Sequence, residues 1–226
     1  MKKPLSQKDA AAKNCRNNYL SPLLFMFFLS AALLILPAVA RAAADMELPE
    51  TSYGAQNKAL KILIVYATRA GSTIEVAQSI GKKLATGGAA VDVKPVKNAA
   101  NLKDYQAVIL GSAIRRGALL PEVTDFAKTN KEELKKIPVA CFIVCMILRE
   151  DSEQNRAKAA SYIKPLQDEL SFVDAGFFTG KLDYSRLNFI DAFIIKYFIG
   201  TPEGDLRDWQ KINDWAENLG IKLKNK

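Results

Sequence analysis

The sequence contains no histidine among its 226 residues. This absence excludes Ser-His-Asp and Cys-His nucleophile systems, histidine general bases and most zinc sites. Cysteine is also scarce: three are present, at positions 15, 141 and 145, too few for a disulfide framework or a four-thiolate metal site. We therefore expect no metal site. Any chemistry must come from backbone groups, hydroxyls, carboxylates, arginine, lysine or a bound cofactor.

Dense basic clusters are missing from most of the chain. Residues 1–44 hold six of the 32 basic and one of the 24 acidic residues, so +5 of the net charge of +8 lies there. Residues 45–226 contain no run of five Lys or Arg, and we expect no nucleic-acid binding. With 49% hydrophobic and 25% charged residues, the composition is that of a chain with a real core, which excludes disorder throughout.

Residues 1–44 are predicted to be a signal peptide or a membrane anchor. Five basic residues precede an uncharged stretch whose apolar core spans residues 23–40. Small residues around Ala40 favour cleavage by signal peptidase, whereas an apolar run near about 18 residues favours an uncleaved anchor. A buried core helix is the third alternative. Under the first two, the body is exported. We therefore expect it in the periplasm or on the outer face of the inner membrane, secreted or anchored by residues 20–40.

The rest of the chain alternates between strand and helix patterns. Residues 45–60 are polar and are interpreted as a linker, and residues 61–226 as one domain. Short apolar runs predict strands at 61–66, 91–93, 106–110, 138–146 and 172–179. Helical spacing predicts helices at 72–86, 119–136, 151–170 and 205–220. This alternation predicts an α/β fold with a doubly wound, five-stranded parallel sheet.

Particular residues are expected to set the ends and bends of these elements. Gly111 should end the third strand, Pro165 should kink the third helix, and Glu203-Gly204-Asp205 should form the turn that caps the last helix. Cys141 and Cys145 are four residues apart in one predicted strand, so they face the same way at about 13 Å and cannot form a disulfide. We expect them to be buried packing residues.

The turn after the first strand is rich in hydroxyls and backbone donors. It reads Thr68-Arg69-Ala70-Gly71-Ser72-Thr73, and a helix is predicted to begin there. A helix N-terminus carries positive potential, glycine allows close backbone approach, and the hydroxyls can donate, so this turn suits a phosphate. It is neither a G-x-G-x-x-G nor a Gly-Lys-Ser/Thr motif. A plain capping turn is the alternative, since Ser and Thr commonly cap helices.

Residues 64–80 resemble the flavodoxin signature at every restricted position, including Thr68, Gly71, Thr73, Ala77 and Ile80. The resemblance implies a flavodoxin-like fold that binds FMN, with the phosphate held by residues 68–73. It also implies that two later stretches, residues 111–117 and 144–149, border the isoalloxazine ring. The site residues so implied are Thr68, Arg69, Ala70, Gly71, Ser72, Thr73, Ser112, Ala113, Ile114, Arg115, Gly117, Cys145, Met146 and Ile147.

Further motifs resemble a narrower group, the flavodoxin-type menaquinone-dependent protoporphyrinogen oxidases. They are residues 111–115, residues 138–142, the run Gly180-Lys-Leu-Asp-Tyr184, and Asp208-Trp209. The resemblance implies an FMN-dependent oxidoreductase with a quinone acceptor. Two alternatives stay open: an exported flavodoxin-type electron shuttle that docks on a redox protein, and a flavin-free interaction module. The loops beside the ring carry no Trp or Tyr, where flavodoxin carriers usually place aromatic residues.

Residues 187–199 are apolar around most of a predicted helix, which is too short to span a bilayer. With Arg186 and Lys196 beside it, the segment 186–199 is predicted to contact the membrane or a quinone. A core-packed helix that covers the sheet edge is the alternative.

Overall fold

The computed structural model describes residues 48–55, 60–99, 101–187, 189–194, 196–197 and 202–225. The signal peptide or anchor predicted within residues 1–44 lies outside these residues. Within the described ranges, no helix is both long and apolar enough to cross a membrane.

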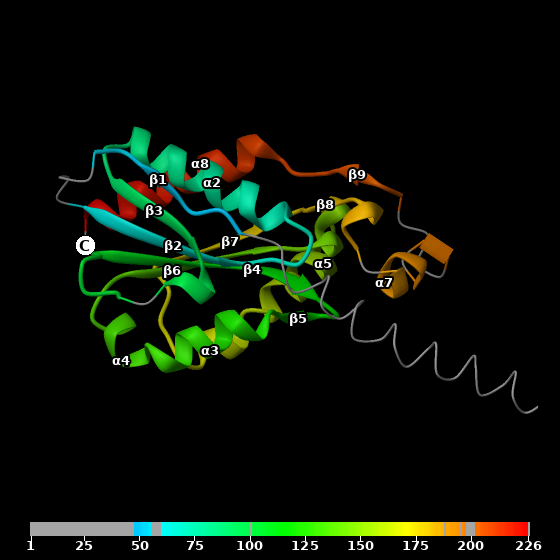
Figure 1. Ribbon diagram of the computed structural model, residues 1–226, viewed down its shortest axis with the longest axis horizontal. Helices are drawn as coiled ribbons and strands as arrows, with labels where there is room; N and C mark the ends of the chain where they lie inside the picture. The colour runs from blue at the N-terminus through cyan, green and yellow to red at the C-terminus, as the bar shows by residue number, and fades with distance from the viewer. Residues whose placement is uncertain are drawn as a thin grey trace, which may run out of the picture. The chain divides into compact units, whose positions relative to one another are not determined.

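Five parallel strands form the centre of the sheet, as the alternating pattern predicted (Figure 1). Along the sheet their order is β3-β2-β4-β6-β7, which is the 2-1-3-4-5 order of flavodoxin-like doubly wound folds. Their bounds are β2 Lys61–Ala67, β3 Ala90–Pro95, β4 Ala107–Arg115, β6 Val139–Val144 and β7 Asp174–Phe178.

Two short antiparallel strands extend this sheet and correct the sequence analysis. β1 (Thr51–Tyr53) pairs with β3, so part of the segment interpreted as a linker belongs to the sheet. β5 (Ala118–Leu119) forms a hairpin with β4. The third strand does not end at Gly111 but runs on to Arg115. A Cβ on Gly111 would lie 2.3 Å from the Phe142 ring, so glycine serves packing there rather than strand termination.

Helices cover both faces of the sheet (Figure 1). Successive residues of β2 face opposite ways: Ile62 and Ile64 join the core beneath two helices, while Leu63 and Val65 join the core on the other side. The first core is covered by α2 (Ser72–Thr86) and α8 (Trp209–Lys224). The second is covered by α3 Pro121–Thr129, α4 Lys131–Leu134, α5 Glu153–Ser161 and α6 Lys164–Gln167.

Two of the predicted helices are divided in the structure. The segment predicted at 119–136 forms α3 and α4, with Asn130 between them. The segment predicted at 151–170 forms α5, capped by Ser152, and α6. Pro165 lies at the start of α6, where a missing N–H costs no hydrogen bond, so it begins a new helix instead of kinking a long one.

A segment between β7 and α8 forms a two-stranded ladder of β8 (Lys181–Leu182) and β9 (Gly204–Asp205). We call residues 180–187 with 202–207 the insert. Because Gly204 and Asp205 form a strand, they do not cap the last helix as predicted. The Asp208 side chain caps α8 instead, accepting from the Lys211 N–H at 2.9 Å.

The apolar helix α7 (Phe189–Ile194) follows the insert's first half. Three aromatic side chains in and just after this helix are exposed: Phe189 and Phe193 of α7 by 83% and 46%, and Tyr197 by 66%. They contact one another, with ring centroids 6.3 Å apart for the first pair and 4.9 Å for the second. These side chains are therefore not core residues, which removes the core-packed alternative for them.

Candidate functional site

A cavity of about 510 Å³ opens at the carboxyl ends of β2, β4 and β6, where ligands bind in open α/β sheets. Its volume lies within the ~300–1,000 Å³ typical of small-molecule sites. The insert forms one wall. The lining residues are Thr68, Arg69, Ala70, Ser72, Ala113, Ile114, Arg115, Arg116, Val144, Cys145, Met146, Gly180, Lys181, Leu182, Asp183 and Leu187.

The loop from β2 to α2 presents backbone donors to this cavity. Gly71 is the N-cap of α2 and adopts a φ of 88°, a left-handed conformation that favours glycine. No side chain caps the helix. The Ile74 N–H donates to the Gly71 carbonyl at 3.0 Å. The N–H groups of Ser72 and Thr73, which no side chain caps, keep their capacity to bind an anion, and the helix dipole adds about half a positive charge.

Two threonines complete the loop. The Thr68 hydroxyl accepts from the Gly71 N–H at 3.0 Å, which fixes the turn. Thr73 lies in the first turn of α2 and is fully buried, yet its Oγ1 has no hydrogen-bond partner. A buried hydroxyl without a partner costs free energy unless a ligand supplies one. Thr73 does not line the cavity, but its hydroxyl is a donor that an anion on this loop would satisfy and that a plain capping turn leaves unused.

The remaining loop residues play different parts. Ala70 and Ser72 line the cavity. Arg69 lines it too, but its guanidinium forms an ion pair with Glu122 of α3 at 2.5 Å. Gly180 comes close from the insert: a Cβ there would lie 3.2 Å from Val144 Cγ1 and 3.6 Å from Ser72 Oγ.

The loop after β4 contributes Ala113, Ile114 and Arg115 to the cavity. The predicted residue Ser112 does not line it: its Oγ accepts from the Leu120 N–H at 3.0 Å and donates to the Ala113 carbonyl at 2.8 Å, which is a structural role. Gly117 does not line it either.

Gly117 instead forms the two-residue turn between β4 and β5 together with Arg116. Both have positive φ, 52° for Arg116 and 76° for Gly117, as a type I′ hairpin turn requires. The turn brings Arg116 to the cavity wall.

The loop after β6 contributes Cys145 and Met146, while Ile147 packs against the second core. Burial raises the pKa of the Cys145 thiol to about 11, so it stays protonated at neutral pH and is a poor nucleophile. Cys141 is buried in the core, as predicted, and both cysteines are free thiols. Among the described residues, no group of three or more Cys, Asp or Glu could hold a metal ion.

The insert supplies the site residues that the sequence analysis missed: Gly180, Lys181, Leu182, Asp183 and Leu187. A signal was present, since the run 180–184 carried part of the family resemblance. The run was not assigned to the site because nothing in its spacing shows which part of the fold it reaches.

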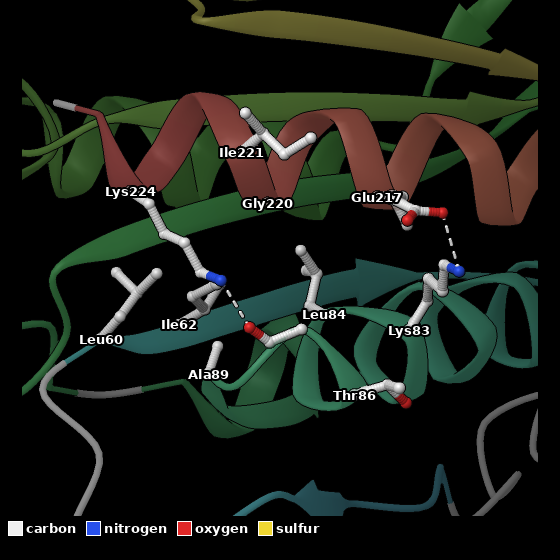
Figure 2. A pocket seen from close by; sticks show the side chains of 12 residues that line it. Leu60, Ile62, Lys83, Leu84, Thr86, Ala89, Glu217, Gly220, Ile221 and Lys224 are labelled. Carbon is white, nitrogen blue, oxygen red and sulfur yellow. Dashed lines mark hydrogen bonds and ion pairs between the residues drawn. The ribbon is translucent and has the colours of Figure 1, made fainter.

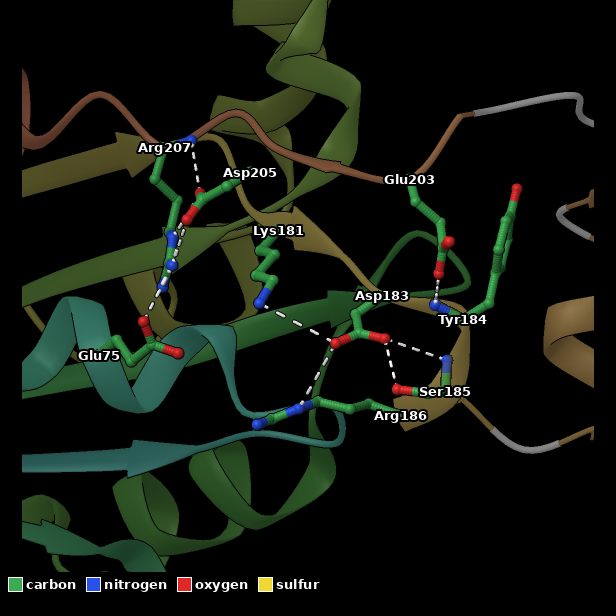
Figure 3. A network of polar contacts seen from close by, with 9 residues as sticks. All are labelled: Glu75, Lys181, Asp183, Tyr184, Ser185, Arg186, Glu203, Asp205 and Arg207. Atoms are coloured by element: carbon green, nitrogen blue, oxygen red, sulfur yellow. Dashed lines mark hydrogen bonds and ion pairs between the residues drawn. The ribbon is translucent and has the colours of Figure 1, made fainter.

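The insert is held in place by one buried arginine (Figure 3). The Arg207 side chain, 3% exposed, pairs with Asp205 of β9 at 2.5 Å and with Glu75 of α2 at 2.9 Å. Burial opposes the charge on Arg207, but hydrogen bonds to both carboxylates raise its pKa above the usual value. Glu75 lies in the first turn of α2, so Arg207 fixes the insert against the helix that begins at the loop.

A second cavity, of about 220 Å³, lies between α2 and α8 (Figure 2). It is bounded by an ion pair of Lys83 with Glu217 at 2.8 Å and by the Lys224 ammonium, which donates to the Gly87 carbonyl at 2.5 Å. None of the predicted site residues lines it.

The sequence and the structure were compared with known protein families, proteins and solved structures. The family model of the flavodoxin domain matches residues 63–206 of the sequence. Protoporphyrinogen IX dehydrogenase (quinone) of Leishmania major is 30% identical over 163 residues, covering 69% of this chain and 70% of that protein. The Escherichia coli K12 protein of that name is 24% identical over 172 residues, covering 71% and 94%. A solved short-chain flavodoxin associated with a bacterial microcompartment matches with 13% identity and a TM-score of 0.48, covering 74% and 97%.

Proposed function

Because this chain belongs to the flavodoxin-domain family, we propose that it binds FMN in the cavity beside residues 68–73 and works as an oxidoreductase with a quinone acceptor. The observation that carries the proposal is the uncapped start of α2 with the buried, unpartnered Thr73 hydroxyl. The uncapped N–H groups of Ser72 and Thr73 and the Thr73 hydroxyl are donors without a cap or partner, and they lie where the resemblance to flavodoxins implies a phosphate.

The residues around the cavity fit an FMN molecule. The loop 68–73 would hold the phosphate through hydroxyl and backbone donors. The cavity walls at 113–115 and 145–146 would contact the ring system, with Ile114 and Met146 in place of aromatic residues. The loop offers a place for one phosphate and no partner for an adenosine half, which favours FMN over FAD.

Bound FMN would supply the redox chemistry, accepting two electrons from a reduced donor and passing them to the quinone. The protein's own part is binding, orientation and charge. Arg115, Arg116 and Lys181 line the cavity together with one carboxylate, that of Asp183, which pairs with Lys181 at 3.9 Å, so the lining has a net positive charge. The Cys145 thiol, kept protonated by burial, takes no part as a redox nucleophile.

The donor and acceptor are proposed from the relatives. Two proteins named protoporphyrinogen IX dehydrogenase (quinone) align over about 70% of this chain. We therefore propose a porphyrinogen as donor and a lipid-soluble quinone as acceptor. Each two-electron step removes two electrons and two protons from the porphyrinogen and converts one quinone to its quinol. The exposed aromatic side chains of α7 suit contact with the bilayer in which such a quinone is dissolved.

Anaerobic turnover of the purified full-length chain tests this function. Loss of porphyrinogen should depend on added menaquinone analogue, with quinol formed in equal two-electron amounts. If FMN is bound but only a redox protein accepts the electrons, the electron-shuttle alternative holds. If no flavin binds at all, the flavin-free interaction module holds.

We also propose that the leader, residues 1–44, exports the body or anchors it on the outer face of the inner membrane. A reporter enzyme fused after Lys226 tests this topology. Activity of an export-dependent reporter supports it, and activity confined to a cytoplasm-dependent reporter contradicts it.

A further inference from the structure

One cation of the insert lies directly over the loop that would hold the phosphate. A Cβ built on Gly71 would stand 2.6 Å from Arg186 Nη1 and 3.8 Å from Arg186 Cζ. Apart from Gly71 itself and its neighbours Ala70 and Ser72, no other atom of the described residues comes within 4 Å of that point. Arg186 thus reaches back from the end of the insert to the start of α2 (Figure 3).

The ion pair of Arg186 with Asp183 does not by itself explain this placement. The Arg186 Nε and Asp183 Oδ2 atoms are 3.7 Å apart, and the arginine side chain is 52% exposed. Surface pairs of this kind contribute little to stability. Asp183 is held mainly by Ser185, whose N–H and hydroxyl donate to it at 3.1 and 2.5 Å. Asp183 therefore orients the guanidinium while leaving it able to bind an anion.

The charges on the other side of the loop are already paired. Arg69 pairs with Glu122, and Glu75, the acidic residue in the first turn of α2, pairs with Arg207. A phosphate monoester carries about −1.5 to −2 charges at neutral pH. The start of a helix supplies only about +0.5. An arginine is the side chain best suited to supply the remaining positive charge, because its planar fork matches phosphate oxygens.

We propose that Arg186 is a ligand of the cofactor phosphate, carried by the insert and oriented by Asp183. The insert then has a second role besides forming a cavity wall: it closes over the phosphate end of the site. Because Arg207 of the insert pairs with Glu75 of α2, the distance between Arg186 and the loop is fixed. This inference rests on the proposed function, since the anion is the phosphate of FMN.

The test compares two flavins that differ only in the phosphate. FMN and riboflavin are titrated separately into apoprotein of the full-length chain, followed by quenching of flavin fluorescence, for the unmodified chain and for Arg186→Gln. The matched control is Arg156→Gln, because Arg156 also pairs with an aspartate and is 57% exposed, but it lies on α5 and has no atom within 4 Å of the Cβ position at Gly71. The ³¹P resonance of bound FMN gives a second readout that does not depend on affinity.

We expect Arg186→Gln to weaken FMN binding on the order of tenfold to a hundredfold, as for loss of a hydrogen bond to a charged group. Riboflavin affinity should stay within about twofold of the unmodified chain. The ³¹P resonance should shift, Arg186→Lys should restore part of the affinity, and Arg156→Gln should change nothing.

Three results would overturn the inference. Unchanged FMN affinity and ³¹P resonance in Arg186→Gln would show that the arginine is not a phosphate ligand. An equal loss of FMN and riboflavin would show that it acts on the ring or on the loop as a whole. If the unmodified chain binds neither flavin, the proposed function fails and this inference fails with it. The first two results leave the proposed function standing.

Discussion

Arg186 Nη1 occupies the space beside Gly71 that any larger side chain would need, 2.6 Å from the position of a Cβ. Gly71 is thus required for two independent reasons. Its φ of 88° is strained for other residues, and its open face admits the guanidinium. The second reason connects the insert to the loop, although the two are far apart in the sequence.

Gly71→Ala should therefore weaken FMN binding by at least about tenfold, because the new methyl displaces Arg186 and narrows the approach to the loop. Titration with FMN measures this. Gly88→Ala is the matched control: Gly88 has a similar φ of 98°, but a Cβ there meets nothing within 4 Å. Both variants should lose about 1–2 kcal/mol of stability from backbone strain. Equal FMN affinity in the two variants would contradict the role given to Gly71.

Thr73→Val should move stability and affinity in opposite directions. Valine removes a buried hydroxyl that has no partner, so the apoprotein should become about 1 kcal/mol more stable. FMN affinity should fall about tenfold, since the donor to the phosphate is lost. Thermal unfolding of the apoprotein and FMN titration measure the two effects.

The control for Thr73→Val lies in the last turn of α2. The Thr86 hydroxyl donates to the Lys82 carbonyl at 3.0 Å at an exposed position. Thr86→Val should leave FMN affinity unchanged. If Thr73→Val also leaves it unchanged, the hydroxyl does not contact the phosphate.

Much of the fold follows from local patterns. The predicted helix at 72–86 agrees with α2 because its apolar residues repeat at helical spacing and Gly87-Gly88 ends it. The strand β1 could not be predicted in this way. It has three residues at the sheet edge, and only its pairing with β3 makes Thr51–Tyr53 a strand. Asp205 and Asp208 are both residue types that cap helices. Only the pairing of β8 with β9, which places Asp205 in a strand, shows that Asp208 is the cap of α8.

The candidate site, too, could be predicted from the sequence only in part. The loop at 68–73 could be predicted because its residue types and its place between strand and helix carry the chemistry locally. The insert could not, since Gly180 and Asp183 enter the cavity only through the fold of a separate segment. Ser112 and Ile147 show the converse limit: both lie in the predicted loops, but side-chain direction turns them into structural and core positions.

Asp92 should stabilise the fold in a pH-dependent manner. Its carboxylate, 7% exposed, accepts from Ser52 of β1 at 2.6 Å and from the Tyr105 hydroxyl at 2.8 Å. Burial raises its pKa, but these hydrogen bonds and Lys61 outweigh burial and hold the pKa below the usual value. The stabilisation is therefore present above the unfolded pKa of about 3.9 and is lost as the pH falls through the folded value.

We expect Asp92→Asn to lower the free energy of unfolding by about 1–3 kcal/mol at pH 7. The deficit should shrink as the pH falls below about 4 and disappear below the lower folded pKa, where the aspartate is protonated in both the folded and the unfolded state. Denaturant unfolding of the apoprotein at several pH values measures it. Asp104→Asn, at an exposed position, is the control and should change stability little. A deficit that does not vary with pH would contradict the electrostatic explanation.

The aromatic residues of α7 should bind lipid rather than stabilise the fold. Phe193→Ser with Phe189→Ser should lower binding of fragment 45–226 to anionic vesicles by about tenfold or more, since each buried aromatic contributes about 1.5–3 kcal/mol. Thermal stability should stay unchanged, because both side chains are exposed. Phe198, which the sequence also placed in this segment, lies outside the described residues.

Vesicle sedimentation with Ile221→Ser as control decides this prediction. Ile221 is 55% exposed on α8 and lines the second cavity rather than the one beside the insert, so its loss should not affect lipid binding. Equal vesicle binding by all variants, or unfolding of the α7 variant, would contradict the lipid-contact role.

The central claim is that the cavity beside residues 68–73 holds FMN. Its most direct test is the identity of the flavin released by acid from the purified full-length chain, determined by mass spectrometry after reconstitution with a mixture of FMN, FAD and riboflavin. We predict that FMN is retained in an amount equimolar with the chain, in preference to the other two. Retention of FAD, or of no flavin, would contradict the account.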